Sequence, residues 1–331
     1  MALVVSFSAL GQAEASSIAG VIAGMQGMLT DAVIEKVYFT IDEITDLDGV
    51  DLVVYLGESS RFETTLGENR SRVPVVFVKS TMDHLMKREA SDAPRYRMCM
   101  GVADIVTALA RIAPLKACVD PADLDWGPAA GHITGMDAAE RFFVSESIAA
   151  FRETYESLGG RWAREVPENG EFLVFLPMHD PAASALAEIA IEKWPGCTVL
   201  AGDGMTQMTM AEGEPWPANV MRVRHWSAGF DSPCNRRLME LAEAEGIAQC
   251  IDFDSCGMLF GAVMAAEQAY VQNGRDLART PFDGPLGEAC FGSGGEIEPG
   301  RLVAMKGEEL SVVEATAGVE REEAFLFRNF Q

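Results

Sequence analysis

The chain has 331 residues and a formal net charge of −24 at neutral pH. Apolar residues make up 48% and charged residues 23%, which is typical of a globular protein with a sizeable core and unlike a disordered chain. The negative charge argues against nucleic acid and anionic membrane surfaces as partners, because both are bound through lysine and arginine. No apolar run reaches the ~20 residues of a membrane-spanning helix, so no membrane insertion is expected.

The seven cysteines are odd in number and include no CxxC pair, which favours a reducing compartment over a secreted disulfide framework. The densest group is Cys250-x-Asp252-x-Asp254-x-Cys256, whose alternation could place metal ligands on one face of a strand. A helix starting at Asp254 or Ser255 would break that geometry, and no further ligands stand at zinc spacing. We therefore expect neither a metal nor a cofactor. The chain as written is expected to be cytoplasmic, or periplasmic if a signal peptide has been removed.

The first 120 residues alternate between strand and helix patterns, as expected of a parallel, doubly wound sheet. Strands are expected at Leu3–Phe7, Ile34–Phe39, Asp51–Leu56, Val73–Val78, Arg97–Met100 and Leu115–Val119, and helices at Ser16–Leu29, Met82–Lys87 and Ala103–Ile112. The stretch Asp120–Asp137 carries several Gly and Pro residues, and we interpret it as a domain crossing or a lid.

The alternation resumes in a second unit that opens with Phe142–Val144. Strands are expected at Phe172–Leu176, Thr198–Ala201 and Asn219–Arg224, and helices at Ile148–Leu158, Ala182–Lys193, Cys234–Glu245 and Cys256–Gln272. A strand–turn–strand then surrounds FDGPLG, where Gly284 and Gly287 can adopt backbone angles closed to other residues. Phe291–Glu296 is expected to form a tight hairpin turn.

Four loops follow the carboxyl ends of predicted strands, which is where open parallel sheets bind ligands. They are residues 57–60, 79–81, 178–180 and 202–206. Hydroxyls and amides at helix N-termini suit a carboxylate, and a carboxylate such as Asp203 suits an ammonium or amide group. Each residue also has a structural explanation: Ser80 or Thr81 as a helix cap, His179 as a turn residue packed on Trp126 or Trp226, and Asp203 as a turn former.

No catalytic residue is assigned, because the sequence contains no HExxH, GxSxG or Walker motif. A family resemblance is carried by FDGPLGEACFGSGGEIEPGRLVAMKGEELSVVE (282–314), the preceding helix GMLFGAVMAAEQAY, and the segments GVDLVVYLGESS and VPVVFVKST. These stretches resemble the branched-chain amino acid and amide-binding group of type I periplasmic-binding proteins, the group that includes Leu/Ile/Val-binding proteins.

The resemblance implies an α/β protein with two doubly wound Rossmann-like lobes, a hinge and a ligand cleft. The N-terminal lobe would comprise residues 1–115 and 251–315, and the C-terminal lobe residues 116–250 and 316–331. The implied function is a receptor or sensor for an amino acid or amide-like molecule, with closure of the cleft on binding. Its partners would be the small-molecule ligand and either an ABC transporter or a regulated protein, and a homodimer is also expected.

Carried over by position, Ser59 or Ser60 and Ser80 or Thr81 would hold the carboxylate or carbonyl of the ligand. Asp203 would receive its ammonium or amide, with Thr206 in the same loop, and His179 would stand in the wall of the second lobe. The alternative is a metal-dependent enzyme related to fucose isomerase, which RMCMGVADIVTALARI and CNRRLMELAEAEGIAQCIDFD loosely resemble. Such an enzyme needs Glu, Asp and His ligands around a divalent metal, and no convincing Glu/His pair is found.

Overall fold

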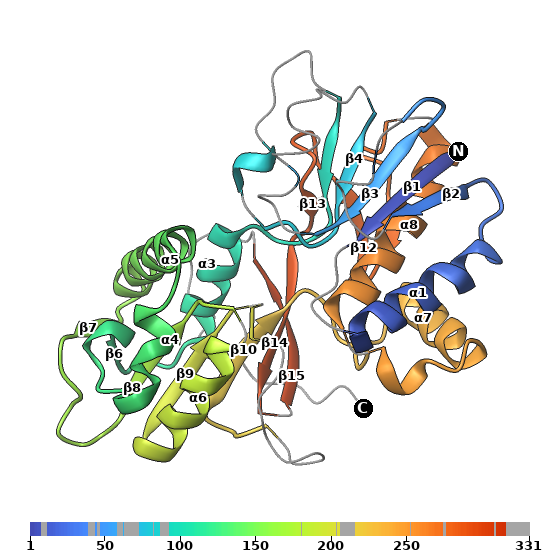
Figure 1. The fold of residues 1–331 in the computed structure, drawn as a ribbon. Coiled ribbons are helices and arrows are strands. Elements are labelled where there is room, and N and C mark those ends of the chain that lie inside the picture. The colour runs from blue at the N-terminus through green and yellow to red at the C-terminus, as the bar shows by residue number, and fades with distance from the viewer. Residues whose placement is uncertain are drawn as a thin grey trace. The chain divides into compact units, whose positions relative to one another are not determined.

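The protein is described from a computed structural model, shown in Figure 1. The structure describes residues 1–7, 12–38, 44, 47–57, 62, 73–81, 83–86, 93–179, 181–202, 204–205, 216–251, 253–273, 276–307 and 309–315. The chain divides into two units, each assembled from two separate stretches. Unit 1 comprises Met1–Gly101 with His225–Arg301, and unit 2 comprises Val102–Arg224 with Leu302–Gln331.

Unit 1 contains a five-stranded, all-parallel sheet in the order β2-β1-β3-β4-β5. Its strands are β1 (Ala2–Phe7), β2 (Val33–Tyr38), β3 (Leu52–Leu56), β4 (Val75–Phe77) and β5 (Arg95–Arg97). All five residues of β3 are buried, because a central parallel strand is covered on both faces and needs apolar side chains on each. The continuous apolar run LVVYL therefore forms a strand although its residues do not alternate between apolar and polar.

Three helices pack together in unit 1: α1 (Gln12–Gln26), α7 (Pro233–Ala244) and α8 (Asp254–Asn273). Helix α8 lies against β3, and small residues let it approach its neighbours closely. An added Cβ at Gly257 would collide with the ring of Trp226, which explains why glycine stands there. A separate apolar cluster, which includes Val53, Tyr55 and Phe77, gathers alternate residues of β3 and β4.

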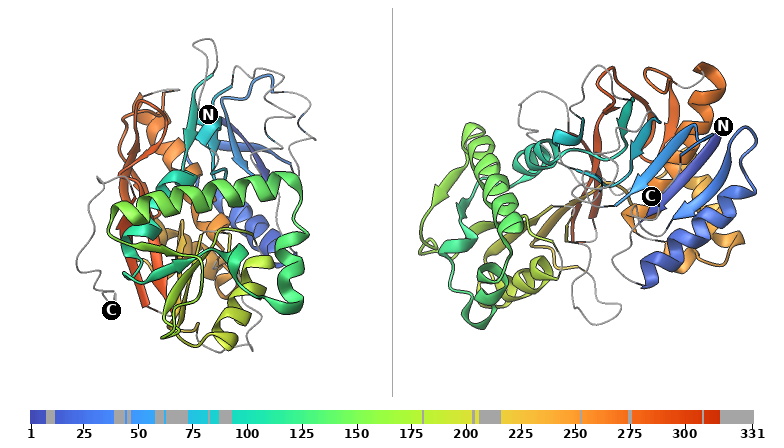
Figure 2. Two further views of the ribbon diagram at one scale, coloured as in Figure 1. Left: turned by 90° about the vertical axis from the view of Figure 1, so that its left-hand side faces the viewer. Right: turned by 45° about the horizontal axis from the view of Figure 1, so that its top comes forward.

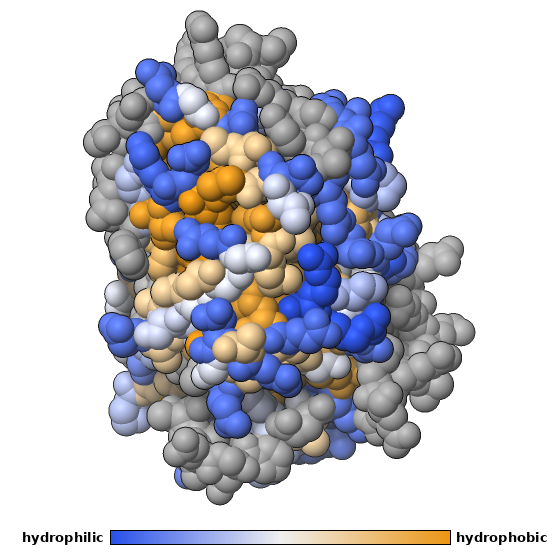
Figure 3. Space-filling view, turned by 90° about the vertical axis from the view of Figure 1, so that its right-hand side faces the viewer, coloured by the Kyte–Doolittle hydropathy of each residue, from blue (hydrophilic) through white to orange (hydrophobic). Residues whose placement is uncertain are grey.

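The edge strand β2 leaves apolar surface uncovered in unit 1. Val33, its first residue, is 60% exposed. Figure 3 shows one side of the molecule, where an irregular apolar area is interrupted by hydrophilic residues. The rest of unit 1 includes a three-stranded antiparallel sheet formed by β11 (Phe282–Gly284), β12 (Gly287–Phe291) and β13 (Ile297–Glu298).

Unit 2 is built on a seven-stranded sheet in the order β15-β14-β10-β9-β8-β6-β7. The parallel strands are β6 (Ala117–Val119), β7 (Arg161–Ala163), β8 (Phe172–Leu176), β9 (Cys197–Ala201) and β10 (Val220–Arg224). Strand β14 (Arg301–Lys306) pairs antiparallel with β10, and β15 (Glu309–Glu314) follows it at the sheet edge.

The helices of unit 2 are α3 (Val102–Ile112), α4 (Ala130–Thr134), α5 (Ala138–Ser157) and α6 (Ala182–Lys193). In β8, Phe172, Val174 and Leu176 join a core cluster with α6, whereas Phe175 stacks on Phe151 of α5. Successive strand residues point to opposite faces, so β8 needs apolar residues at every position. The 20-residue helix α5 lies across this unit, as the left view of Figure 2 shows.

The strands and helices expected from the sequence are present in the structure with shifts at several ends, and three stretches differ from the expectation. Met82–Lys87 contains a 3-10 helix at Asp83–Met86 rather than an α-helix, and Phe142–Val144 lies inside α5. The stretch 120–137, interpreted as a crossing or lid, contains short helices, and Trp126 and Met136 from it join the core of unit 2. None of the helices formed by the described residues is long and apolar enough to cross a membrane.

The boundaries of the units also differ from the predicted lobe boundaries near residues 115 and 250. The chain passes between units after Gly101, Arg224 and Arg301. Helix α3 belongs to unit 2 because it packs against α5 and β10, and α7 belongs to unit 1 because it packs against α1 and α8. These contacts join residues distant in sequence, so local patterns could not place the boundaries.

Candidate functional site

In unit 1, the loops after β3 and β4 are joined through Ser80. Its side chain is buried, and its Oγ donates a hydrogen bond to the carbonyl oxygen of Gly57 at 2.7 Å. The two loops follow neighbouring strands of a parallel sheet, so their ends meet at the same edge. The hydroxyl proton of Ser80 is therefore engaged within the protein, and its oxygen can still accept a hydrogen bond.

Thr81 is partly buried, and its carbonyl oxygen accepts a hydrogen bond from Nη1 of Arg97 at 2.9 Å. Arg97 ends β5, so a third strand of the same sheet reaches this loop. The other residues predicted for this edge, Ser59 and Ser60, lie outside the described residues. Their part in the site stays a prediction.

In unit 2, His179 follows the carboxyl end of β8 and is exposed. Its imidazole stacks on the ring of Phe143, with centroids 5.7 Å apart and planes 12° from parallel. Its carbonyl oxygen accepts a hydrogen bond from the amide of Ala183 in the first turn of α6. The ring partner is therefore Phe143, whereas Trp126, one of the partners considered from sequence, packs on Trp194.

The loop after β9 reaches His179 through Gly204. A Cβ at Gly204 would lie 2.7 Å from His179 Nδ1 and 3.1 Å from the carbonyl oxygen of Met178. An added Cβ would therefore force the His179 ring or the backbone to shift, so the loops after two neighbouring strands touch at this point. Asp203 and Thr206 of the second loop lie outside the described residues, and their roles stay predictions.

Arg224 ends β10 and is buried, and sequence analysis did not single it out. It places a positive charge at the carboxyl end of a strand in a strongly acidic chain. Arg222, two residues earlier, lies with its guanidinium carbon 3.6 Å from the centroid of the Trp216 ring, a cation–π contact. Two arginines inside the short apolar strand VMRVR are the signal that could have indicated them.

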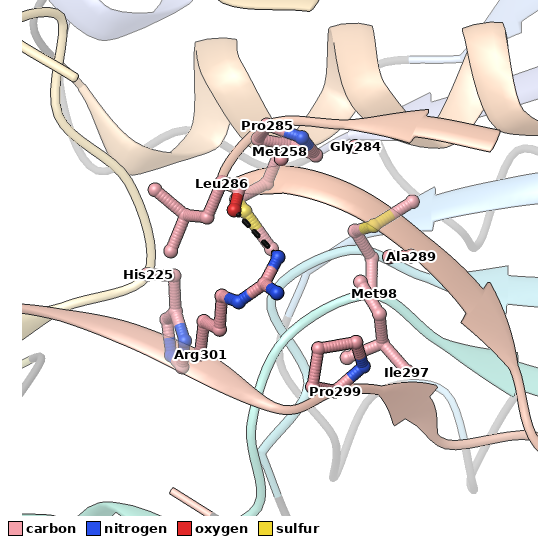
Figure 4. Close-up of a pocket in the computed structure, with 11 residues that line it drawn as sticks. Met98, His225, Met258, Gly284, Pro285, Leu286, Ala289, Ile297, Pro299 and Arg301 are labelled. Atoms are coloured by element: carbon pink, nitrogen blue, oxygen red, sulfur yellow. Dashed lines mark hydrogen bonds between the residues drawn. The ribbon is translucent and has the colours of Figure 1, made fainter. Parts of the chain in front are cut away.

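A small pocket in unit 1 is lined mainly by apolar side chains, as Figure 4 shows. Its wall includes Met98, Met258, His225 and Arg301, and Arg301 Nη1 donates to the carbonyl oxygen of Leu286 at 3.0 Å. The cavity volume is about 20 Å³, which is room for about one water molecule. It is too small for an amino acid and does not qualify as the ligand site.

The Cys250–Cys256 segment does not form a strand that could present four ligands on one face. Asp254 begins α8, and its carboxylate accepts a hydrogen bond from the backbone amide of His225 at 2.9 Å. Cys256 is buried within the same helix. No group of three His, Cys, Asp or Glu side chains suited to a metal occurs in the part of the chain that the structure describes, a part that omits Asp252.

Buried thiols in both units are held in the protonated form. Burial raises the pKa of Cys118 far above its ordinary value, and burial raises the pKa of Cys197 and of Cys234 to about 12. Burial and then the negative charge of Glu298 also raise the pKa of Cys290. A nucleophilic cysteine needs a lowered pKa, so these four thiols are unsuited to that chemistry.

No protein-family model matches the chain, and no curated protein matches it. Solved structures do. A solute-binding protein of an ABC transporter from Rhodopseudomonas palustris, in complex with p-hydroxybenzoic acid, superposes with a TM-score of 0.67 at 13% identity, covering 95% of this chain and 96% of that chain. The chain has the type I periplasmic-binding-protein fold.

Two further structures with this fold were found for amino-acid-binding proteins. The leucine-binding protein LivK from Thermotoga maritima gives a TM-score of 0.66 at 13% identity, covering 94% of this chain and 97% of that chain. LivJ from Streptococcus pneumoniae, in complex with isoleucine, gives 0.64 at 14% identity, covering 95% and 99%. The predicted type I periplasmic-binding-protein fold, with its doubly wound α/β sheets, is thereby confirmed.

Proposed function

We propose that this protein is a receptor for a small amino-acid or amide-like molecule, or another small carboxylate. The observation that carries the proposal is the structural likeness to solute-binding proteins over almost the whole chain. The loops at the carboxyl ends of its parallel strands, where such sheets bind ligands, are built from polar groups and close glycine contacts. Nothing comparable supports the isomerase alternative, so the proposal is a binding protein rather than an enzyme.

On this proposal, the loops after β3 and β4 hold the carboxylate or carbonyl of the ligand. Ser59, Ser60 and Thr81 would contribute hydroxyls, and Ser80 would contribute its backbone amide or its oxygen lone pairs, since its proton is already donated to Gly57. Asp203 and Thr206 would receive the ammonium or amide group.

The exposed His179, stacked on the half-buried Phe143, would form a flat wall for the ligand's apolar part. Some of the proteins with this fold were solved with isoleucine and others with aromatic acids. A carboxylate is common to both kinds of molecule, and Arg224 adds a positive charge at the carboxyl end of β10. A wall of this kind accommodates either a branched aliphatic or an aromatic side chain.

The partner we propose is the membrane component of an ABC transporter, which places the working protein outside the cytoplasm. A cytoplasmic sensor that regulates another protein is the second arrangement, and a homodimer is compatible with both. Expression of the native gene product, followed by cell fractionation, distinguishes the two locations. Sedimentation of the purified chain measures its oligomeric state.

The proposal is tested by a thermal-shift screen followed by calorimetric titration. The probes are L-leucine, L-isoleucine, 4-hydroxybenzoate, benzoate, acetamide, fucose and the divalent ions Mg²⁺ and Mn²⁺. A probe at about 100 times its dissociation constant should stabilise the protein by about 2.7 kcal/mol. A shift with divalent metal alone, with turnover of fucose that a chelator abolishes, would contradict the receptor proposal.

Two variants and their matched controls test the assigned contacts with whichever probe binds. Asp203→Ala should abolish most affinity for an amino acid or amide, and Asp123→Ala, at an exposed position of the same unit, should not. His179→Ala should weaken binding, and His132→Ala, at an exposed position in α4, should leave it unchanged. Unchanged affinity in Asp203→Ala would remove the proposed ammonium partner.

A further inference from the structure

Arg97 connects three segments of unit 1 that are far apart in sequence. It is 2% exposed and lies at the end of β5. Its Nε and Nη2 donate to the two carboxylate oxygens of Glu296, each at 2.8 Å, and its Nη1 donates to the carbonyl oxygen of Thr81 at 2.9 Å. One planar guanidinium therefore holds the hairpin turn after β12 and the loop after β4 at the same time.

The hairpin turn is shaped to lie against β5. The amide of Arg97 donates to the carbonyl oxygen of Gly295 at 2.8 Å, and Arg97 and Glu296 form an isolated β-bridge. Gly295 has a φ of +84°, and a Cβ there would collide with the carbonyl oxygen of Arg95. Glycine thus permits both the turn and the close approach, which brings the carboxylate of Glu296 onto the guanidinium.

The geometry of this contact depends on arginine. The two parallel hydrogen bonds to Glu296 form a bidentate, charge-assisted pair, and the third donor points to a different segment. A lysine ammonium carries one compact charge on a flexible stem and cannot reproduce a rigid fork. Burying the charge of Arg97 is costly unless the guanidinium is paired and hydrogen-bonded, and this cost favours the arrangement in which Glu296 stays bound to it.

We infer that Arg97 and Glu296 are positioning residues that set the conformation of the loop 78–81, and through it the affinity for a small carboxylate or amide. The inference rests on the proposed function, because it treats this loop as part of the ligand site. Ser80 extends the effect to the loop after β3 through its bond to Gly57. The hairpin turn at 292–296 therefore affects the candidate site indirectly, by holding the loop 78–81 through Arg97, and does not itself contact the ligand.

Hydrogen exchange of the full chain, without any ligand, tests the positioning role. Glu296→Gln removes the charge of the pair, and Arg97→Lys keeps the positive charge but loses the fork. Both should speed exchange of the amides in the loop 78–81 by about tenfold, the equivalent of one charge-assisted hydrogen bond, while exchange in α8 stays unchanged. Asp231→Asn is the control, since it removes an exposed pair with Arg236 in the same unit.

Calorimetric titration with L-leucine and 4-hydroxybenzoate then tests the consequence for binding. Glu296→Gln should weaken the probe that the wild type binds by about tenfold, and Asp231→Asn should not. Unchanged exchange in the loop overturns the inference, and so does faster exchange with unchanged affinity, which would make the pair a structural brace only. If the wild type binds neither these probes nor the screened set, the proposed function fails, while the exchange data still decide whether the pair orders the loop.

Discussion

Gly204 shows how one residue without a side chain can determine the position of a candidate ligand residue. The loop after β9 passes so close to His179 that any Cβ at position 204 would press on the imidazole and on the carbonyl of Met178. The imidazole in turn lies flat on Phe143. The imidazole of His179 is therefore contacted on two sides, by the ring of Phe143 and by the backbone at Gly204.

Gly204→Ala should destabilise the protein by about 1–3 kcal/mol, because the added Cβ forces the His179 ring or the loop backbone to shift. It should also weaken binding of any probe that contacts His179. Urea unfolding followed by circular dichroism measures the first effect. The matched control is Gly131→Ala in α4, where an added Cβ meets nothing within 4 Å and helix propensity favours alanine. Equal stability of the two variants would mean that the two loops do not touch.

Residue patterns selected the loops of the candidate site but not the contacts within those loops. The rule that ligands bind beyond strand ends selected Ser80, Thr81 and His179 from the sequence alone. Their partners could not be inferred in the same way, because Gly57 follows another strand and Arg97 ends a third. Phe143 precedes His179 by 36 positions and lies in a helix that the sequence had not extended so far.

At the scale of elements, strands buried on both faces were the strongest local signal. FLVFL and LVVYL are uninterrupted apolar runs, and each forms a fully buried central strand. Short helices gave weaker signals: the 3-10 helix at Asp83–Met86 carries too few residues for a helical pattern to emerge. The unit boundaries depend on which helices pack together, and no local pattern contains that information.

Phe175→Ala tests whether β8 packs against apolar side chains on both faces of the sheet. Phe175 is 1% exposed and stacks on Phe151 at a centroid distance of 4.6 Å, on the face opposite Val174. Truncating it should cost about 3–5 kcal/mol, since the cavity adds to the lost burial. Val33→Ala on the exposed edge of β2 is the control and should change stability by less than about 0.5 kcal/mol. A small loss in Phe175→Ala, measured by urea unfolding, would contradict the packing of α5 on this sheet.

For the molecule as a whole, the excess of acidic side chains is the dominant electrostatic feature. Fifty acidic residues outnumber twenty-six lysines and arginines, which gives the net charge of −24. Self-repulsion of this kind destabilises a compact state, and dissolved salt screens it. Raising the salt from about 0.01 M to about 1 M shortens the screening length from about 30 Å to about 3 Å.

The urea midpoint of unfolding should therefore rise with sodium chloride at neutral pH, most steeply at low concentration. Exposed ion pairs such as Arg152–Glu156 and Lys193–Asp125 are weakened by the same screening, but such pairs contribute only about 0–1 kcal/mol each. The pair of Arg97 with Glu296 is screened less, because the Arg97 side chain is buried. Potassium chloride serves as the control for specific binding of sodium and should give the same curve. A midpoint that falls with both salts would show that attractive pairs outweigh repulsion, despite the net charge.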